Sequence, residues 1–197
     1  MVIKTRDRLI EVARQLFAHK GVDKTTMNDI ANASERGRRT IYTYFRNKKE
    51  IYNAVLEAES EQLVTSLREI AVGSGPVDQR LADFLRCRIC HIKGQSASTL
   101  KNWLMFDTRR LERINRMAAD KESALLSDLL AEGCRKGVFN PARCRLFATF
   151  IDRMLELLEM PLAAAPKISD ARRHEIAESF IEFCVSDLKS DIQPAEN

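Results

Sequence analysis

Apolar residues recur at helical spacing along almost the whole sequence, and only seven Gly and five Pro interrupt the pattern. No run alternates between apolar and polar residues for long enough to favour a β-strand. The pattern therefore predicts an all-α protein. With 197 residues, the chain is long enough to bury a core without disulfide or metal staples. No stretch approaches the roughly 18 consecutive apolar residues that a transmembrane helix needs, so we expect no membrane partner.

Breaks in the pattern divide the chain into ten expected helices. Thr25 and Thr26 offer N-cap oxygens to the second helix, and Asn47 offers one to the long fourth helix. The clearest later break is the segment from Gly73 to Pro76. The expected helices span residues 4–19, 27–33, 38–44, 48–71, 77–93, 97–106, 108–118, 120–136, 141–160 and 169–190.

Positive charge is concentrated near the N-terminus. Residues 1–52 contain 12 Lys+Arg against 6 Asp+Glu, a balance of +6, whereas residues 53–197 contain 20 against 22, a balance of −2. A basic module joined to a slightly acidic one suggests a polyanion partner for the first part, although a solvated basic surface would give the same balance. We expect an N-terminal domain of residues 1–52, a helical domain of residues 53–190 and a tail of residues 191–197.

The two short helices at 27–33 and 38–44, joined by four residues after a longer amphipathic helix, have the layout of a helix-turn-helix. The second short helix must fit a major groove about 12 Å wide, with hydrogen-bond donors outside and apolar anchors behind. Ile41 and Phe45 are four residues apart and can face the core. The candidate DNA-binding residues are Thr26, Arg36, Arg38, Arg39, Thr40, Tyr42, Tyr44 and Lys48.

This region resembles the DNA-binding domain of the tetracycline-repressor (TetR) type regulators. The resemblance covers residues 8–52 and includes Arg8-Leu9-Ile10, Ala13, Leu16-Phe17, Gly21, Thr25-Thr26, Ile30-Ala31, Thr40 to Phe45, Lys48 and Glu50-Ile51. It implies a homodimer on a palindromic operator in double-stranded DNA, with a C-terminal domain that dimerises and binds an effector. It also implies phosphate contacts for Thr26, Thr40, Tyr42 and Lys48.

Arg38 and Arg39 match the start of the family's recognition helix, where bases are read. For each of them, a phosphate contact or a solvated charge is the alternative. The turn between the short helices departs from the family's usual Ala-Gly-Val-Ser. Glu35 replaces a glycine that permits positive φ, Arg36 replaces a buried valine, and Gly37 replaces a capping serine. Because the flanking anchors keep their spacing, we expect a shifted or looser turn rather than loss of the motif.

The last two expected helices are apolar over a wider stripe than a simple surface helix needs. Two such helices from each subunit can form a four-helix interface about a two-fold axis, while a purely intramolecular core is the alternative. The predicted interface residues are Phe147, Ile151, Leu155, Leu158, Phe180, Cys184 and Leu188.

The middle helices should enclose an effector pocket, mostly apolar with a few polar groups. Trp103 can equally belong to an ordinary core. The candidate lining residues are Phe84, Cys87, His91, Trp103, Phe106 and Met117.

Cys87, Cys90 and His91 match the spacing of haem attachment, C-x-x-C-H. That chemistry follows export, and the N-terminus carries no export signal, so we expect a cytoplasmic protein with inert thiols, no metal and no cofactor. Cys134, Cys144 and Cys184 have no partner spacing and are expected to be buried thiols.

Together these features predict a ligand-responsive transcription regulator, with repression as the first hypothesis and a small, largely apolar effector. The alternative is a thiol-redox or metal-responsive helical protein that uses Cys87, Cys90 and His91. An enzyme is not expected, because no set of nucleophile, base and orienting residue can be recognised.

Overall fold

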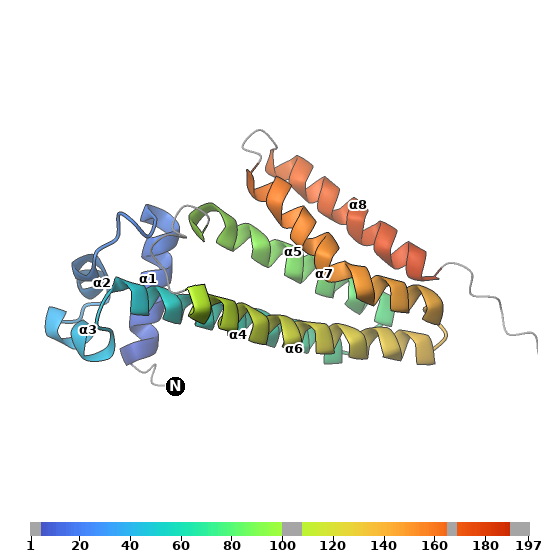
Figure 1. Cartoon of the computed structure of the whole chain (residues 1–197), viewed down its shortest axis with the longest axis horizontal. Helices are drawn as coiled ribbons and strands as arrows, with labels where there is room; N and C mark the ends of the chain where they lie inside the picture. The colour runs from blue at the N-terminus through green and yellow to red at the C-terminus, as the bar shows by residue number, and fades with distance from the viewer. Residues whose placement is uncertain (1–4, 100–107, 165–168, 190–197) are drawn as a thin grey trace, which may run out of the picture. The chain divides into compact units, whose positions relative to one another are not determined.

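The computed structural model describes residues 5–99, 108–164 and 169–189, and it is helical throughout apart from short connections (Figure 1). The prediction of an all-α chain is confirmed. Among the described residues, no helix combines the length and apolar character that crossing a bilayer requires. The helices are α1 (Thr5–Lys20), α2 (Met27–Ala33), α3 (Arg38–Tyr44), α4 (Lys48–Val72), α5 (Val77–Thr99), α6 (Thr108–Arg135), α7 (Pro141–Ala164) and α8 (Asp170–Lys189).

Two expected helix breaks are absent. Helix α5 continues through Gly94 to Thr99, because a glycine inside a helix costs about 1 kcal/mol but keeps its backbone N–H and so does not end the helix. Helix α6 runs without interruption from Thr108 to Arg135, although we expected a break near residue 119. That position is alanine, the strongest helix former. The helix expected at 97–106 lies largely outside the described residues.

The described side chains form two separate hydrophobic cores in two compact units. The first unit contains residues 1–62 and 97–118, and the second contains residues 63–96 and 119–197. In the first unit, α1 to α4 each contribute a side chain with no exposed surface. These residues are Leu9, Ile30, Ile41 and Ile51. Both short helices therefore pack against α1 and the start of α4 in one hydrophobic core.

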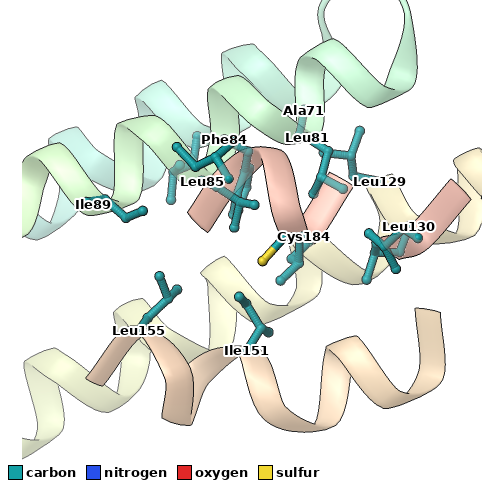
Figure 2. Packing of buried hydrophobic residues seen from close by; sticks show 14 of the residues in the cluster. Ala71, Leu81, Phe84, Leu85, Ile89, Leu129, Leu130, Ile151, Leu155 and Cys184 are labelled. Atoms are coloured by element: carbon teal, nitrogen blue, oxygen red, sulfur yellow. The ribbon is translucent and has the colours of Figure 1, made fainter. Parts of the chain in front are cut away.

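The second core gathers side chains from α4 to α8. In Figure 2, Ile151 and Leu155 of α7 point toward Cys184 of α8 and Leu85 of α5. Four residues predicted to contact a second subunit are thus buried within this chain, with exposures of 5% or less. They are Ile151, Leu155, Cys184 and Leu188. The apolar face that contains them is covered by the chain's own helices, and a contact of these four residues with a second subunit stays a prediction.

The turn between α6 and α7 folds back tightly on α6. The backbone N–H groups of Val138 and Phe139 donate to the carbonyl of Gly133 at 2.9 and 3.2 Å. The Phe139 ring covers Gly133 so closely that a Cβ at position 133 would lie 2.0 Å from Cδ2 of the ring. Asn140 then caps α7, because its Oδ1 accepts from the Ala142 N–H at 2.9 Å. Glycine at 133 is therefore required by this close approach.

Candidate nucleic-acid interface

Thr26 begins α2 with a reciprocal cap. The N–H of Asp29 donates to Thr26 Oγ1 at 3.1 Å, and the Thr26 N–H and hydroxyl both donate to Asp29 Oδ2 at 2.8 Å. These hydrogen bonds hold the pKa of Asp29 below its ordinary value, and the bond from the Thr26 backbone N–H has the largest effect. Of the two predicted N-cap candidates, Thr25 and Thr26, it is Thr26 that caps the helix. Its role as a phosphate contact stays a prediction.

The turn between α2 and α3 is a regular helix ending. Glu35 N–H donates to Asn32 O and Arg36 N–H donates to Ala31 O, each at 3.1 Å. This is the double hydrogen bond of a Schellman motif, whose pivotal residue adopts a left-handed conformation and is usually glycine. Here Glu35 adopts it, with φ of 56°. The expectation that Glu35 gives up the positive φ and loosens the turn is therefore wrong, and the glutamate bears the backbone strain instead.

Helix α3 turns its apolar anchors inward and its hydrogen-bond donors outward. Ile41 is fully buried and Phe45 is 3% exposed, whereas Tyr42 is 43% exposed. Arg38 and Arg39 are both exposed as well. Gly37 precedes the helix without a side-chain cap hydrogen bond, as expected for a weak cap.

The exposed side chains of α3 are mainly arginines and tyrosines. The Arg38 guanidinium lies 5.8 Å from the centroid of the Tyr42 ring, within the range of a cation–π contact. Arg36, Arg38 and Arg39 have no ion-pair partner among the described residues. Thr40 is half-buried, and Tyr44 is as exposed as Tyr42. The surface therefore carries cationic and phenolic donors that the domain itself does not use.

Lys48 has a contact that the sequence did not indicate. Its Nζ donates to the carbonyls of Val22 at 2.8 Å and Asp23 at 3.3 Å, in the loop between α1 and α2. The ammonium thus joins the start of α4 to that loop, which leaves one of its three N–H hydrogens for another acceptor. Asn47 caps α4 as predicted, accepting from Glu50 N–H at 3.0 Å.

Three further cations flank α3 and were absent from the predicted set. Arg46 and Lys49 are exposed at the junction with α4. Arg6 of α1 places its guanidinium 5.4 Å from the centroid of the Phe45 ring. The charge balance of residues 1–52 indicated an excess of cations, but only the folded structure shows that these three lie around α3.

Three of the six predicted effector residues have side chains that the structure describes, and they differ in exposure. Phe84 is 3% exposed within the second core, and Cys87 is half-buried against that core. Met117 is 55% exposed. The side chains of His91, Trp103 and Phe106 lie outside the described residues.

An open hollow of about 360 Å³ lies elsewhere in the second unit, and it shares no residue with that set. At its wall, the guanidinium of the buried Arg80 donates to Ala71 O and to Glu132. The hollow is lined by Ala71, Val72, Gly73, Arg80, Leu125, Asp128, Leu129, Ala131, Glu132 and Arg135.

Cys87 and Cys90 occupy successive turns of α5, and both are free. Burial, together with the nearby Cys90 and Glu122, raises the pKa of the Cys87 thiol. A raised pKa keeps the sulfur protonated, and the protonated form is the poor nucleophile.

Residues 9–55 match the family described as bacterial regulatory proteins, tetR family. The N-terminal domain belongs to the TetR family. Its TetR-type sequence is 51% identical, over 51 residues, to the probable acrEF/envCD operon repressor of Escherichia coli, a match that covers 26% of this chain and 23% of that protein. The transcriptional regulator TtgR of Pseudomonas putida is 40% identical over 58 residues, which cover 29% of this chain and 28% of that protein. The chain thus matches less than a third of these relatives' length.

Solved structures of transcriptional regulators extend the likeness in fold to nearly the whole chain. A transcriptional regulator from Cytophaga hutchinsonii aligns with a TM-score of 0.79 at 18% identity, covering 92% of this chain and 97% of that one. The fatty acid degradation regulator FadR from Bacillus halodurans aligns with a TM-score of 0.66 at 19% identity, covering 98% of each chain. The predicted architecture, a helix-turn-helix domain followed by a helical domain, is confirmed. The alternative built on Cys87, Cys90 and His91 finds no support among these relatives.

Proposed function

We propose that this chain is a cytoplasmic transcription regulator that binds a palindromic operator as a homodimer and acts as a repressor. The observation that carries the proposal is the outer face of α3. Arg38, Arg39 and Tyr42 are exposed there, and neither arginine has an ion-pair partner in the described part of the chain, on a helix anchored by Ile41 and Phe45. In this proposal residues 1–52 form the part that meets DNA.

Each group on this face suits a different part of the duplex. An arginine that pairs bidentately with guanine discriminates against other bases by about 1–3 kcal/mol. Arg38 is held against Tyr42, which restricts its reach, so we assign base reading first to Arg39. Phosphate contacts, which position the protein without reading sequence, are assigned to Thr26, Arg36, Thr40, Tyr42, Tyr44 and Lys48.

We place the dimer face on the outer side of α7 and α8. Leu146, Phe150 and Phe183 are 62%, 55% and 66% exposed, and large apolar side chains exposed together mark interaction sites. Leu146 and Phe150 are one helical turn apart and so lie on the same stripe of α7. Phe147 and Phe180 are half-buried and can remain at its edge, while Leu158 lies outside the described side chains.

The effector, a small and largely apolar molecule, is assigned to the second unit. It would act by population shift, favouring a dimer whose two recognition helices no longer match major grooves about 34 Å apart. A ligand that binds both dimer states equally would change nothing. The proposal therefore requires differential affinity and assigns no catalytic step.

The test is a selection of bound duplexes from a random DNA library with the purified full-length chain. Enrichment of an inverted repeat, lost in the Arg38→Ala/Arg39→Ala double variant, is expected. The matched control is the Lys20→Ala/Lys24→Ala double variant, which removes equal charge from exposed positions outside α3 and should still enrich the same repeat. Absence of any enriched sequence from the wild-type selection would overturn the proposal.

A further inference from the structure

Arg80, in the first turn of α5, is a charged side chain buried against the end of α4. Its side chain is only 9% exposed, and its backbone N–H donates to the carbonyl of Pro76 at 3.0 Å. The guanidinium Nη1 donates to the carbonyl of Ala71, one of the last four carbonyls of α4, which lack a partner inside the helix. A cation is favoured at this end of a helix because the helix dipole is negative there. Arg80 therefore caps α4 from a neighbouring helix.

The guanidinium of Arg80 keeps one donor unused. Its Nη2 donates to Oε1 of Glu132 on α6, but its Nε is buried and has no hydrogen-bond acceptor among the described residues. Arg86 of the same helix shows a complete pairing, because its Nε and Nη2 donate to both carboxylate oxygens of Glu178 at 2.8 and 2.7 Å. A buried donor without an acceptor costs free energy. The Nε–H of Arg80 therefore lacks a second oxygen of the kind that Glu178 supplies to Arg86.

Glu132 is held by two cations rather than one. Lys136, one turn further along α6, donates from Nζ to the same Oε1 at 2.7 Å. Lys136, and then Arg80, hold the pKa of Glu132 below its ordinary value, so this carboxyl is ionised at neutral pH. Because Lys136 binds Glu132 independently of Arg80, the carboxylate can leave the guanidinium and still keep an ion pair.

The hollow of about 360 Å³ in the second unit lies beside this guanidinium, because Arg80 and Glu132 both line it. That volume is at the lower end of the range for small-molecule sites. Ala71 and Leu129, which also line it, belong to the second core (Figure 2). The remaining apolar lining residues are Val72, Leu125 and Ala131, and the remaining charged ones are Asp128 and Arg135. The hollow thus combines an apolar lining with charged groups.

We propose that this hollow binds a small organic carboxylate with a compact apolar body, and that Nε and Nη2 of Arg80 hold the carboxylate. Two parallel N–H donors of one guanidinium match the two oxygens of a carboxylate. Because Nε is buried, the ligand reaches it as Glu132 moves off Arg80 and stays with Lys136. Arg135 is exposed at the hollow and has no ion-pair partner among the described residues, so it supplies a second cation.

The charges at the hollow favour an anion over a cation. Arg80, Arg135 and the adjoining Lys136 carry three positive charges, against the two negative charges of Asp128 and Glu132. An amine would meet Asp128, which is exposed, and an exposed ion pair contributes little. A carboxylate would meet the buried Arg80, where the lower dielectric strengthens the attraction. The inference concerns binding alone, so it stands whether or not the chain binds DNA.

Benzoate is the probe, and the Nε–H group of Arg80 reports its binding. The isotope-labelled, full-length protein is titrated with sodium benzoate, and the arginine Nε–H signals are followed by nuclear magnetic resonance. The Arg80 signal is assigned through the bonds that connect it to the backbone of that residue. We expect it to shift with increasing benzoate and to saturate. Benzamide, which lacks the charge, and acetate, which lacks the ring, should each bind about tenfold more weakly.

Variants test how the ligand is held without removing the buried Arg80. Glu132→Gln removes the carboxylate that competes for the guanidinium, so benzoate should bind several-fold more tightly. Arg135→Ala removes the exposed cation of the hollow, so binding should weaken several-fold. The matched control is Arg68→Ala, which removes an exposed arginine of α4 that does not line the hollow and should leave the affinity unchanged.

Sodium chloride at equal concentration controls for a general effect of ionic strength and should not shift the Arg80 signal. The proposal is overturned if that signal stays fixed up to the solubility limit of benzoate, or if chloride shifts it as far. Equal affinity for benzamide and benzoate would also overturn it, because the carboxylate would then carry no part of the binding. So would equal weakening by Arg68→Ala and Arg135→Ala.

Discussion

The ammonium of Lys48, in the first turn of α4, donates a hydrogen bond of 2.8 Å to the carbonyl of Val22 in the loop before α2. One side chain thus connects the long helix to the loop that leads into Thr26. We expect Lys48→Met to lower the free energy of unfolding by about 1 kcal/mol, because a charge-assisted hydrogen bond is lost. Urea unfolding monitored by circular dichroism measures this.

Lys49→Met is the matched control for that variant. Lys49 is exposed, so its loss should change stability by less than about 0.5 kcal/mol. On DNA, Lys48→Met should also reduce the salt slope of binding by about one, as expected for one lost phosphate contact. If the slope is unchanged in a folded Lys48→Met variant, Lys48 contacts no phosphate and has only a structural role.

Glu35 offers a test of the strained turn. Glu35→Gly should raise the free energy of unfolding by about 0.5–1 kcal/mol, because glycine adopts positive φ without the Cβ penalty. Glu35→Ala removes the same charge but keeps the Cβ, so it should bring no such gain. Thermal unfolding of the three proteins gives the comparison. Equal stabilisation by both substitutions would show that charge, and not backbone conformation, is responsible.

Arg39 should read a base. We expect Arg39→Ala to weaken binding to the selected operator by about 1–3 kcal/mol more than binding to random duplex. Arg46→Ala, which removes an exposed cation outside α3, should weaken both by similar amounts. Titrations by fluorescence anisotropy at several salt concentrations provide the numbers. Equal weakening on both duplexes by Arg39→Ala would make it a phosphate contact only.

Phe183 should carry much of the dimer face. Phe183→Ser removes an aromatic ring that is 66% exposed in the single chain, so it should leave the fold intact and shift the assembly toward monomer. The control is Val72→Ser, because Val72 is 74% exposed on α4 and lies away from α7 and α8 in the sequence. Sedimentation velocity at micromolar concentration measures the proportions of monomer and dimer for both variants. A wild type that sediments as a monomer contradicts the dimer itself.

Glu59 makes stability depend on pH in an unusual direction. Burial raises the pKa of its carboxyl above the ordinary value near 4.5, although Arg14 lowers it. The folded state therefore binds this proton more tightly than the unfolded state does. That contribution to stability is complete below the unfolded pKa and is lost as pH rises through the folded pKa.

Glu59→Gln mimics the protonated carboxyl, so the variant should lose less stability than the wild type between about pH 4 and pH 7. Glu61→Gln changes an exposed carboxylate on the same helix and should retain the wild-type pH profile. Unfolding midpoints in urea across this range measure the effect. Parallel profiles for the wild type and Glu59→Gln would contradict it.

The sequence predicted the local structure better than the contacts. Periodicity and capping residues placed α2 and α3 at their observed bounds, because Thr26 and the turn act on immediate neighbours. Helix α7 shows where this reasoning stops. It carries two adjacent apolar stripes, of which Ile151 lies on the buried one and Phe150 on the exposed one. Periodicity identifies both stripes but cannot tell which of them the chain itself covers.

Contacts made through tertiary folding were missed for the same reason. The hydrogen bond from Lys48 to Val22 joins residues that no spacing rule connects. The exposed donors of α3 were predicted because residues on one short helix share a face in a regular way. The sequence could not predict that the arginines of α3 have no ion-pair partner among the described residues, because this depends on where the neighbouring carboxylates lie in the fold.

Gly133 and Phe139 impose a rule on how this sequence can diverge. Because a Cβ at 133 would lie 2.0 Å from the Phe139 ring, neither position can change freely while the other is kept. A lineage that acquires alanine or a larger residue at 133 must first replace the ring at 139 with a smaller side chain. Substitutions at the two positions should therefore arise in a fixed order, and no descendant of this chain should combine a side chain at 133 with the ring at 139.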